Sequence, residues 1–203
     1  MRGMLILARH GESEWNALGK WTGITDVHLT QNGFTQAEQM GLLINDLPVS
    51  YAYCSQQIRT LETLEHMLNA MRQPDVDFDR IAALNERDYG IYTGKNKFEV
   101  QAEVGEEIFQ KIRRSWDYPI PEGETLEMVY ARTIPFLKST ILPRILRGEN
   151  VLVVAHGNSL RSIIKYIESI SDRDIEKYEF DFGHIKIYTL DEAGKMLTHQ
   201  ERF

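Results

Sequence analysis

The sequence predicts an α/β fold, a three-layer sandwich in which helices flank a mostly parallel central sheet. Short apolar runs, which are typical of buried strands, alternate along the chain with stretches of helical periodicity. The run 151–155 is apolar throughout, as expected for a central strand of a parallel sheet. The length of 203 residues fits one domain of ordinary size, so we expect residues 1–203 to form a single domain.

The first elements follow from apolar patterns and from residues that start or stop helices. Met4–Ala8 is predicted to be a buried strand. Residues 11–30 are rich in polar and turn residues without a clear period, which predicts a long functional loop. Thr30 is expected to cap a helix that runs to about Leu47, with Pro48 as the stop.

The middle of the chain combines two short strands, one helix and an irregular region. Tyr51–Cys54 is predicted to be a strand, and Ser55 is expected to cap the helix that follows it. Asp75–Asp79 alternates polar and apolar residues, as an edge strand does. Residues 84–123 are rich in charged residues, glycine and aromatics, which indicates short helices joined by loops over a cleft.

The last part of the chain predicts two helices, a strand between them and a terminal hairpin. A long helix is expected over 125–146, with interruptions at Pro135 and Pro143, because proline lacks the amide hydrogen that a helix needs. The apolar strand 151–155 then leads into a helix over 158–170. Residues from 184 onward form a plausible antiparallel hairpin, with its turn at 191–194.

Two of the predicted buried strands end on the same dipeptide, His-Gly, at His10 and His156. A chain of this composition would contain about 0.4 His-Gly pairs by chance. The carboxyl edge of an open α/β sheet is where ligands bind, so two imidazoles delivered there predict one active site. The alternative is that both histidines only cap strands.

The composition of the chain limits which ligands and which cellular compartment we expect for such a site. The net charge of −7 argues against a nucleic-acid surface, although basic groups can still converge in a cleft that takes an anionic small molecule. No apolar run approaches the roughly 18 residues that span a bilayer, and the amino end is too short for a secretory signal. The single cysteine, Cys54, suits a reducing compartment. We therefore expect a cytoplasmic protein that binds neither nucleic acid nor membrane.

The triplet Arg9-His10-Gly11 is the sharpest local signal for chemistry. A neutral imidazole is a good nucleophile toward phosphorus at physiological pH. The neighbouring arginine offers a planar fork to phosphate oxygens, and the glycine lets the backbone approach an anion closely. These groups suit phosphoryl transfer through a covalent phosphohistidine.

Other segments supply candidates for charge stabilisation and proton transfer. Arg59 follows a predicted strand at the sheet edge, and His156 precedes a helix amino end that attracts anions. Glu86 offers a carboxylate among arginine and aromatic neighbours. Each also has a structural alternative, because Arg59 and Glu86 could be solvated surface residues and Asn158 simply a helix cap.

These residues also carry a family resemblance. Residues 7–16, LARHGESEWN, resemble the signature of the histidine phosphatase superfamily, and further blocks resemble the cofactor-dependent phosphoglycerate mutases. The further blocks are residues 21–23, 26–27, 84–90, 94–97, 113–114, 121–126 and 155–161. They run in order between about residues 4 and 170. A general phosphatase of the superfamily would share only the positions of His10, Arg59, Glu86 and His156, so Lys97 and the pair Arg113-Arg114 are the more specific signs of a phosphoglycerate ligand.

The resemblance implies a role for each matching position. His10 would be the nucleophile, and Glu86 the acid and base that exchanges a proton with the substrate hydroxyl. Arg9, Arg59, Asn16 and His156 would hold the transferring phosphoryl group. The rest of the pocket, for the carboxylate and the second phosphate, would be lined by Ser13, Thr22, Gly23, Tyr89, Lys97, Arg113, Arg114, Gly157 and Asn158.

The implied reaction interconverts 3-phosphoglycerate and 2-phosphoglycerate, with 2,3-bisphosphoglycerate as primer and intermediate and with no metal ion. Residues 1–203 would then be one phosphoglycerate mutase-like catalytic domain. Two departures from the family pattern stand out. The chain reaches Pro121 soon after Arg114, so it resembles a short form that lacks an insertion, which leaves a homo-oligomer possible but undetermined. Phe182 stands where the family has a small residue, and it could reshape the pocket floor or lie outside the pocket.

Two other functions compete with the mutase. The first is a phosphomonoesterase of the same superfamily, in which water accepts the phosphoryl group from His10. The second is a catalytically idle scaffold that keeps the fold for binding. The joint presence of His10, Arg59, Glu86 and His156 weighs against the scaffold, because a binding module needs none of them in those roles.

Overall fold

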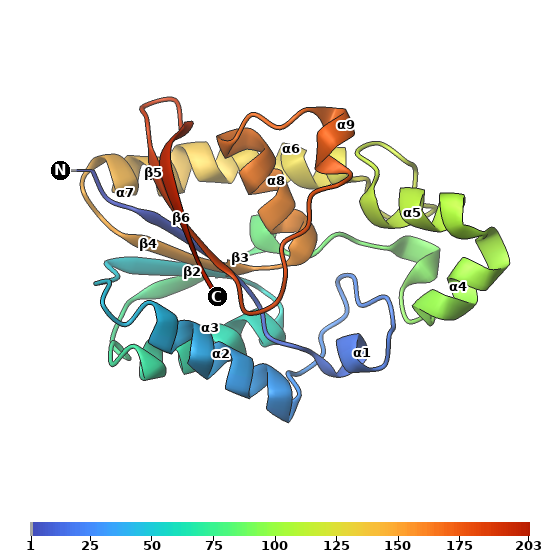
Figure 1. Cartoon of the computed structure of the whole chain (residues 1–203), viewed down its shortest axis with the longest axis horizontal. Coiled ribbons are helices and arrows are strands. Elements are labelled where there is room, and N and C mark those ends of the chain that lie inside the picture. The colour runs from blue at the N-terminus through green and yellow to red at the C-terminus, as the bar shows by residue number, and fades with distance from the viewer. Residues whose placement is uncertain (1) are drawn as a thin grey trace.

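A six-stranded sheet forms the centre of the computed structural model, which describes residues 2–203. The strands lie in the order β3-β2-β4-β1-β5-β6 (Figure 1). The first four pair in parallel, whereas β5 and β6 run antiparallel to their neighbours. Their bounds are Leu5–Arg9 (β1), Tyr51–Ser55 (β2), Phe78–Ile81 (β3), Val151–Ala155 (β4), Ile185–Leu190 (β5) and Met196–Arg202 (β6). The predicted mostly parallel α/β sandwich is confirmed.

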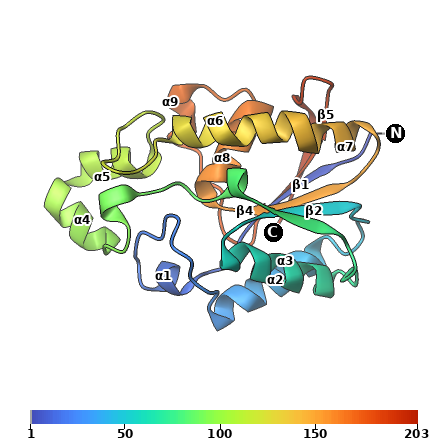
Figure 2. The same cartoon turned by 180° about the vertical axis from the view of Figure 1, so that it is seen from behind.

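Helices cover both faces of this sheet. On one face lie α2 and α3, and on the other lie α6, α7 and α8 (Figures 1 and 2). The short helices α1, α4 and α5 lie beyond the carboxyl ends of the parallel strands (Figure 2). The helices span Glu14–Ala17 (α1), Gln31–Leu43 (α2), Ile58–Ala70 (α3), Lys97–Val104 (α4), Glu106–Arg114 (α5), Leu126–Phe136 (α6), Leu142–Leu146 (α7), Gly157–Ile167 (α8) and Asp172–Ile175 (α9).

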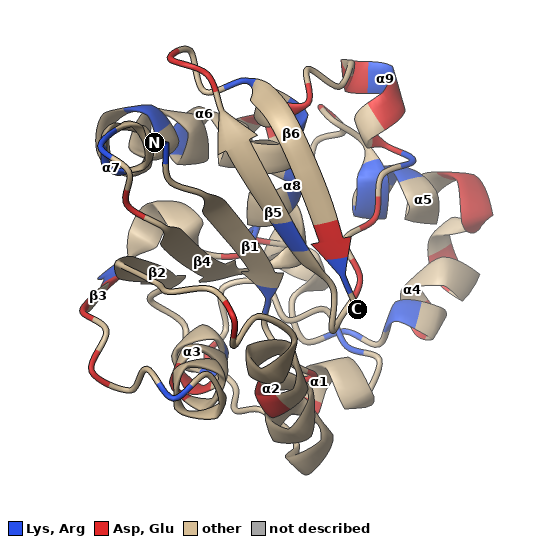
Figure 3. Ribbon diagram, turned by 60° about the vertical axis from the view of Figure 1, so that its left-hand side comes forward, with Lys and Arg blue, Asp and Glu red and all other residues tan. Residues whose placement is uncertain are grey.

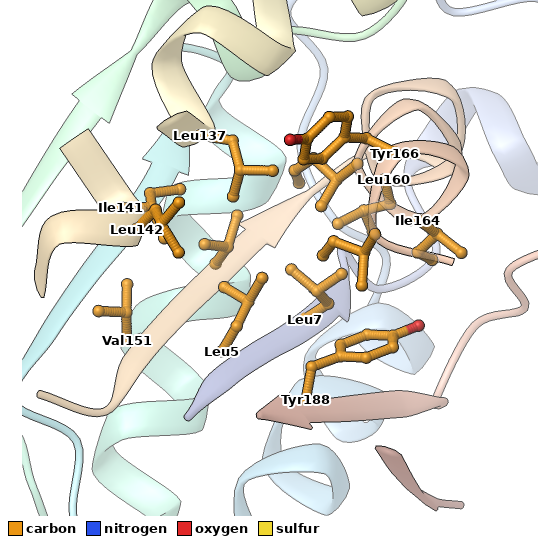
Figure 4. Packing of buried hydrophobic residues seen from close by; sticks show 14 of the residues in the cluster. Leu5, Leu7, Leu137, Ile141, Leu142, Val151, Leu160, Ile164, Tyr166 and Tyr188 are labelled. Carbon is orange, nitrogen blue, oxygen red and sulfur yellow. The ribbon is translucent and has the colours of Figure 1, made fainter. Parts of the chain in front are cut away.

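The core is divided by the sheet because successive side chains of a strand point to opposite faces. In β1, Leu5 and Leu7 pack with α7 and α8 (Figure 4), whereas Ile6 and Ala8 pack with α2 and α3. Every residue of β4 is buried, as expected for a strand with neighbours on both edges. Burial of each large aliphatic side chain contributes about 1.5–3 kcal/mol, so the two layers hold β1 and β4 firmly in register.

Several predicted boundaries differ from the structure. Thr30 caps α2 as predicted, with its Oγ1 accepting the Gly33 amide at 3.0 Å, but the helix ends at Leu43 and continues only as turns. The predicted strand at 75–79 is displaced to Phe78–Ile81, because pairing with Ala52–Ser55 of β2 selects its residues. Local alternation could not reveal that register.

The predicted cap at Ser55 is wrong. Ser55 is the last residue of β2, and the position before α3 belongs to Gln57, whose side chain makes no capping bond. The predicted long helix is divided as expected: α6 contains Pro135, residues 137–141 form a π-helical segment, and α7 has Pro143 in its first turn.

The helix predicted over 158–170 starts one residue earlier, with His156 at its amino cap, and ends at Ile167. It ends there because Ser169 has a φ of 56°, in the left-handed region that a helix cannot continue through. The terminal hairpin is confirmed, and Gly194, with a φ of 76°, closes its turn through a bond to the Asp191 carbonyl.

Candidate active site

The parallel pairing of β1 with β4 brings the two His-Gly corners together. Arg9 pairs with Ala155, and the His10 amide then donates to the Ala155 carbonyl at 3.0 Å. The two imidazole rings lie 4.9 Å apart between centroids, in an edge-on arrangement. His10 is 3% exposed and His156 is 0% exposed. The two corners therefore form one buried site at the carboxyl edge of the sheet.

The surroundings of His10 fix both its orientation and its charge. Its Nδ1 lies 2.6 Å from the Gly11 carbonyl, which can only accept a hydrogen bond, so the ring hydrogen is on Nδ1 and Nε2 keeps its lone pair. Burial, then the charges of Arg59 and Arg9, hold the pKa of His10 well below its usual value, despite the opposing hydrogen bond to Gly11. His10 is therefore a neutral imidazole with Nε2 available as a nucleophile.

A serine orients the second imidazole. The Oγ of Ser55 lies 2.7 Å from Nε2 of His156, while Nδ1 of His156 has no partner among residues 2–203. Burial, then the charges of Arg59 and His10, lower the pKa of His156 well below its usual value. A neutral His156 that accepts the Ser55 hydrogen at Nε2 carries its own hydrogen on Nδ1, where it can be donated to an anion. Sequence reasoning missed this role of Ser55, because nothing local distinguishes it from a helix cap.

Two arginines lie beside the imidazoles, and each has a nitrogen donor that makes no hydrogen bond within residues 2–203. Arg59 is buried and donates to the carbonyls of Gly23 and Thr25 at 3.0 and 2.9 Å, which ties the loop 11–30 to α3. Arg9 donates to the Phe180 carbonyl at 2.9 Å. The Nε atoms of both arginines are buried without a partner in the described chain. Burial lowers the pKa of Arg59 to about 10, so it remains charged at neutral pH and can bind an oxyanion.

The position of Phe182, which sequence reasoning left open, is now clear. Its ring lies 3.8 Å from the guanidinium carbon of Arg9 and 5.9 Å from the His10 ring. The guanidinium carbon of Arg9 also lies 3.7 Å from the point that a Cβ would occupy if residue 157 had a side chain. Phe182 thus contacts the guanidinium and restricts where it can move, and a side chain at position 157 would contact it as well.

The carboxylate of Glu86 is held by donors from α8 and from its own loop. Its Oε1 accepts from the amide and from the side-chain Nδ2 of Asn158, at 3.2 and 3.1 Å, and from the Arg87 amide at 2.7 Å. The Asn158 Nδ2 also bonds the Tyr89 hydroxyl at 2.9 Å. Arg161 bonds the Oδ1 of Asn158 at 3.0 Å. Glu86 therefore faces the cleft in a fixed position suited to moving one proton.

Two small adjoining cavities of about 100 and 70 Å³ form a cleft above these groups. The residues common to both are Arg9, Trp21, Glu86, Tyr89 and Lys97. The smaller cavity adds His10, Asn16, Thr22, Gly23 and Arg59, and the larger adds Arg113, Arg114, Gly157, Asn158, Arg161, Glu179 and Phe180. The two cavities thus form the two halves of one cleft.

Of the residues predicted for the site, two do not line the cleft. His156 lies behind His10 and is fully buried, and Ser13 is buried at the amino cap of α1, where its hydroxyl bonds Asn16 at 2.9 Å. Trp21, Arg161, Glu179 and Phe180 line the cleft without having been predicted. Trp21 and Arg161 belong to the blocks 21–23 and 155–161 that carry the family resemblance. No local pattern marks Glu179 and Phe180, because they reach the cleft through packing of distant segments.

The larger half of the cleft is strongly basic. Figure 3 shows basic residues at the end of β1 and on α4 and α5. Burial, then the charge of Arg113, lowers the pKa of Lys97 to about 8. Burial and the charge of Arg114 also lower the pKa of Arg113. Cations that repel one another in this way favour an anionic ligand, which would relieve the repulsion.

No cluster of three or more His, Cys, Asp or Glu side chains suited to a metal ion is found among the residues described, 2–203. The absence of a metal in the reaction stays a prediction. Within the same residues, no helix is both long enough and apolar enough to cross a membrane.

Comparisons with known proteins identify the family of this chain. The family model of the histidine phosphatase superfamily (branch 1) matches residues 5–201, so the chain belongs to that superfamily. Within it, the chain belongs with the 2,3-bisphosphoglycerate-dependent phosphoglycerate mutases. The mutase of Parvibaculum lavamentivorans is 40% identical, over 96% of this chain and 93% of its own length. That of Brucella melitensis biotype 1 is 43% identical, over 92% and 91%.

Solved structures with lower identity share the fold. A phosphoglycerate mutase from Bacillus anthracis superposes with a TM-score of 0.73 and 20% identity, over 98% of this chain and 90% of its own. A mycobacterial glucosyl-3-phosphoglycerate phosphatase superposes with a TM-score of 0.84 and 17% identity, over 100% and 98%. The same architecture therefore serves proteins named as mutases and as phosphatases, and the residues of the cleft must distinguish them.

Proposed function

We propose that this protein interconverts 3-phosphoglycerate and 2-phosphoglycerate through a phosphohistidine at His10, with 2,3-bisphosphoglycerate as primer and intermediate. The observation that carries the proposal is the state of His10. It is a neutral imidazole with Nε2 unengaged, at the base of a cleft whose other half presents Arg113 and Arg114, while Lys97 lines both halves. The names of the relatives at 40–43% identity support the same reaction.

In the proposed reaction, His10 begins the cycle carrying a phosphoryl group on Nε2. Glu86 removes the proton from the free hydroxyl of 3-phosphoglycerate, and that oxygen attacks phosphorus as the bond from phosphorus to Nε2 breaks. The product is 2,3-bisphosphoglycerate. After it turns in the cleft, Nε2 attacks the other phosphorus, and Glu86 returns the proton to the released oxygen. His10 is phosphorylated again, and 2-phosphoglycerate leaves.

The neighbouring groups would stabilise the charge that develops on the phosphoryl oxygens. The buried Nε atoms of Arg9 and Arg59 lack partners and fit an oxyanion, as does the Nδ1 hydrogen of His156. Asn16 lines the same half of the cleft. The part of the ligand that does not react would meet Thr22, Gly23, Tyr89, Lys97, Arg113, Arg114, Gly157 and Asn158, and Ser13 would support Asn16 from the cap of α1.

We also propose that residues 1–203 act as a single catalytic domain in the cytoplasm, without a metal ion. The buried Cys54 supports a reducing compartment. The hydrophobic clusters on the two faces of the sheet pack against one continuous set of strands, which supports a single domain.

The decisive experiment mixes the purified protein with 3-phosphoglycerate, a trace of 2,3-bisphosphoglycerate and a chelator, and follows both 2-phosphoglycerate and inorganic phosphate. We expect 2-phosphoglycerate to form, and to stop forming in His10→Ala. A matched control is His28→Ala, because His28 is an exposed histidine outside the cleft. Phosphate release without isomerisation would identify a phosphomonoesterase instead. Failure of both ligands to phosphorylate His10 would reject both enzymes.

A further inference from the structure

The segment 176–184, between α9 and β5, brings a carboxylate into the basic half of the cleft. Glu179 pairs through Oε1 with Nη2 of Arg114, and both residues line the larger cavity. The next residue, Phe180, accepts from Arg9 through its carbonyl at 2.9 Å. The segment therefore contacts two of the cations that face a ligand.

Glu179 differs from the other carboxylate of the cleft. Glu86 is held by three donors that belong to the backbone or to Asn158, and none of them is a cationic side chain. Glu179 instead neutralises a guanidinium directly. Burial acts to raise the pKa of Glu179, but the hydrogen bond and charge of Arg114, with Arg113, hold it below its usual range, so the carboxylate is charged at neutral pH.

The Arg114 side chain can exchange one anionic partner for another while its backbone stays fixed. It is the last residue of α5, and its carbonyl accepts from the buried Arg161 at 2.9 Å, which fixes the backbone. Its side chain is 20% exposed and that of Glu179 is 53% exposed, so the pair can open without disturbing the core. A partly exposed pair of this kind contributes little to stability, so Arg114 can exchange Glu179 for another anion at small cost.

We propose that Glu179 is a specificity-determining residue that competes with the ligand for Arg114. In the empty cleft its carboxylate stands where the carboxylate or second phosphate of a phosphoglycerate would bind, and the ligand must displace it. Glu179 thereby weakens binding of the second anionic group and leaves binding of the transferred phosphoryl group unchanged. This inference rests on the proposed function for the identity of the ligand.

The test measures binding rather than turnover. In a His10→Asn background, which cannot take up a phosphoryl group, calorimetry compares 3-phosphoglycerate with glycerol 3-phosphate, which lacks the carboxylate. We expect Glu179→Gln to tighten binding of 3-phosphoglycerate about three- to tenfold and to change binding of glycerol 3-phosphate by less than about twofold. The control is Asp181→Asn, which removes the same charge from an exposed residue of the same segment that does not line the cleft.

Four results would overturn the inference. Weaker binding of 3-phosphoglycerate in Glu179→Gln would mean that Glu179 holds Arg114 in its binding position. Equal tightening for both ligands, or the same effect from Asp181→Asn, would mean general electrostatics. No change in either ligand would mean that the pair does not compete. Because these measurements need no isomerisation, they remain informative if the mutase assay fails, and an active mutase with no binding difference would reject this inference alone.

Discussion

Arg161 donates a hydrogen bond from Nη1 to Oδ1 of Asn158 at 3.0 Å, inside the buried base of the cleft. A guanidinium can only donate, so this bond turns the carbonyl side of the Asn158 amide toward Arg161. The Nδ2 side then faces Glu86 at 3.1 Å and the Tyr89 hydroxyl at 2.9 Å. Arg161 thus fixes which side of the Asn158 amide faces the Glu86 carboxylate.

Removing Arg161 should therefore impair phosphoryl transfer as well as folding. We expect Arg161→Met to lower the free energy of unfolding by about 1–3 kcal/mol, because the carbonyls of Arg114 and Ile175 lose their donor. We expect phosphorylation of His10 in a rapid-quench assay to slow about tenfold or more, because Asn158 can now rotate away from Glu86.

Arg87→Met is the matched control for that variant. Arg87 is also buried and also donates to backbone carbonyls of α5, those of Ile112 and Arg113, but it does not bond the Asn158 side chain. It should lose comparable stability and much less of the transfer rate. Equal losses of rate in the two variants would contradict an orienting role for Arg161.

Ser55 should matter to the rate without touching the ligand. Its Oγ lies 2.7 Å from His156 Nε2, and donation from this hydroxyl would leave the ring hydrogen of His156 on Nδ1. We expect Ser55→Ala to lower kcat roughly tenfold, the effect of one lost hydrogen bond of about 1–1.5 kcal/mol, with little change in KM. Ser162→Ala removes another buried hydroxyl of the same region, bonded to the Asn158 carbonyl, and should leave kcat nearly unchanged. A similar kcat for both variants would remove Ser55 from this role.

The two buried imidazoles should make the protein sensitive to mild acid. Their pKa values in the folded state lie well below the usual value of 6.5, so the unfolded chain binds more protons as the pH falls. The free energy of unfolding should therefore be fully maintained above pH 6.5 and should decline below it. Urea titrations between pH 7.5 and about 5 measure this. The double variant His10→Asn, His156→Asn should show a shallower decline, and an unchanged slope would contradict the assignment.

Phe182 should help to direct the phosphoryl group to the substrate rather than to water. Its ring contacts the Arg9 guanidinium at 3.8 Å, an interaction of about 0.5–2 kcal/mol. We expect Phe182→Ala to raise the ratio of phosphate release to isomerisation about 3- to 30-fold, since the guanidinium becomes mobile and water gains access to His10. Phe182 and Phe203 both line an apolar groove outside the cleft. Phe203→Ala removes the second of these aromatic side chains, and its ratio should stay at the parental value. A parental ratio in Phe182→Ala would show that Phe182 only fills space.

The sequence was sufficient for the fold class and for the principal chemical groups. An apolar run that ends on His-Gly can be interpreted from neighbouring residues alone. A buried strand must end at the sheet edge, so the residue that follows it lies at that edge. For that reason His10 and His156 could be predicted to meet. Helix starts such as Thr30 were also local, because one hydroxyl satisfies an amide three residues away.

Only the tertiary structure decided which residues surround those groups. Ser55 and His156 are 101 residues apart, and Arg114 and Glu179 are 65 apart, so no local pattern connects either pair. The register of β3 depended in the same way on its pairing with β2. The sequence determined by itself that two imidazoles reach one edge of a sheet, because strand periodicity is local. The hydroxyl that holds His156, and the carboxylate that competes for Arg114, were decided by packing between distant segments.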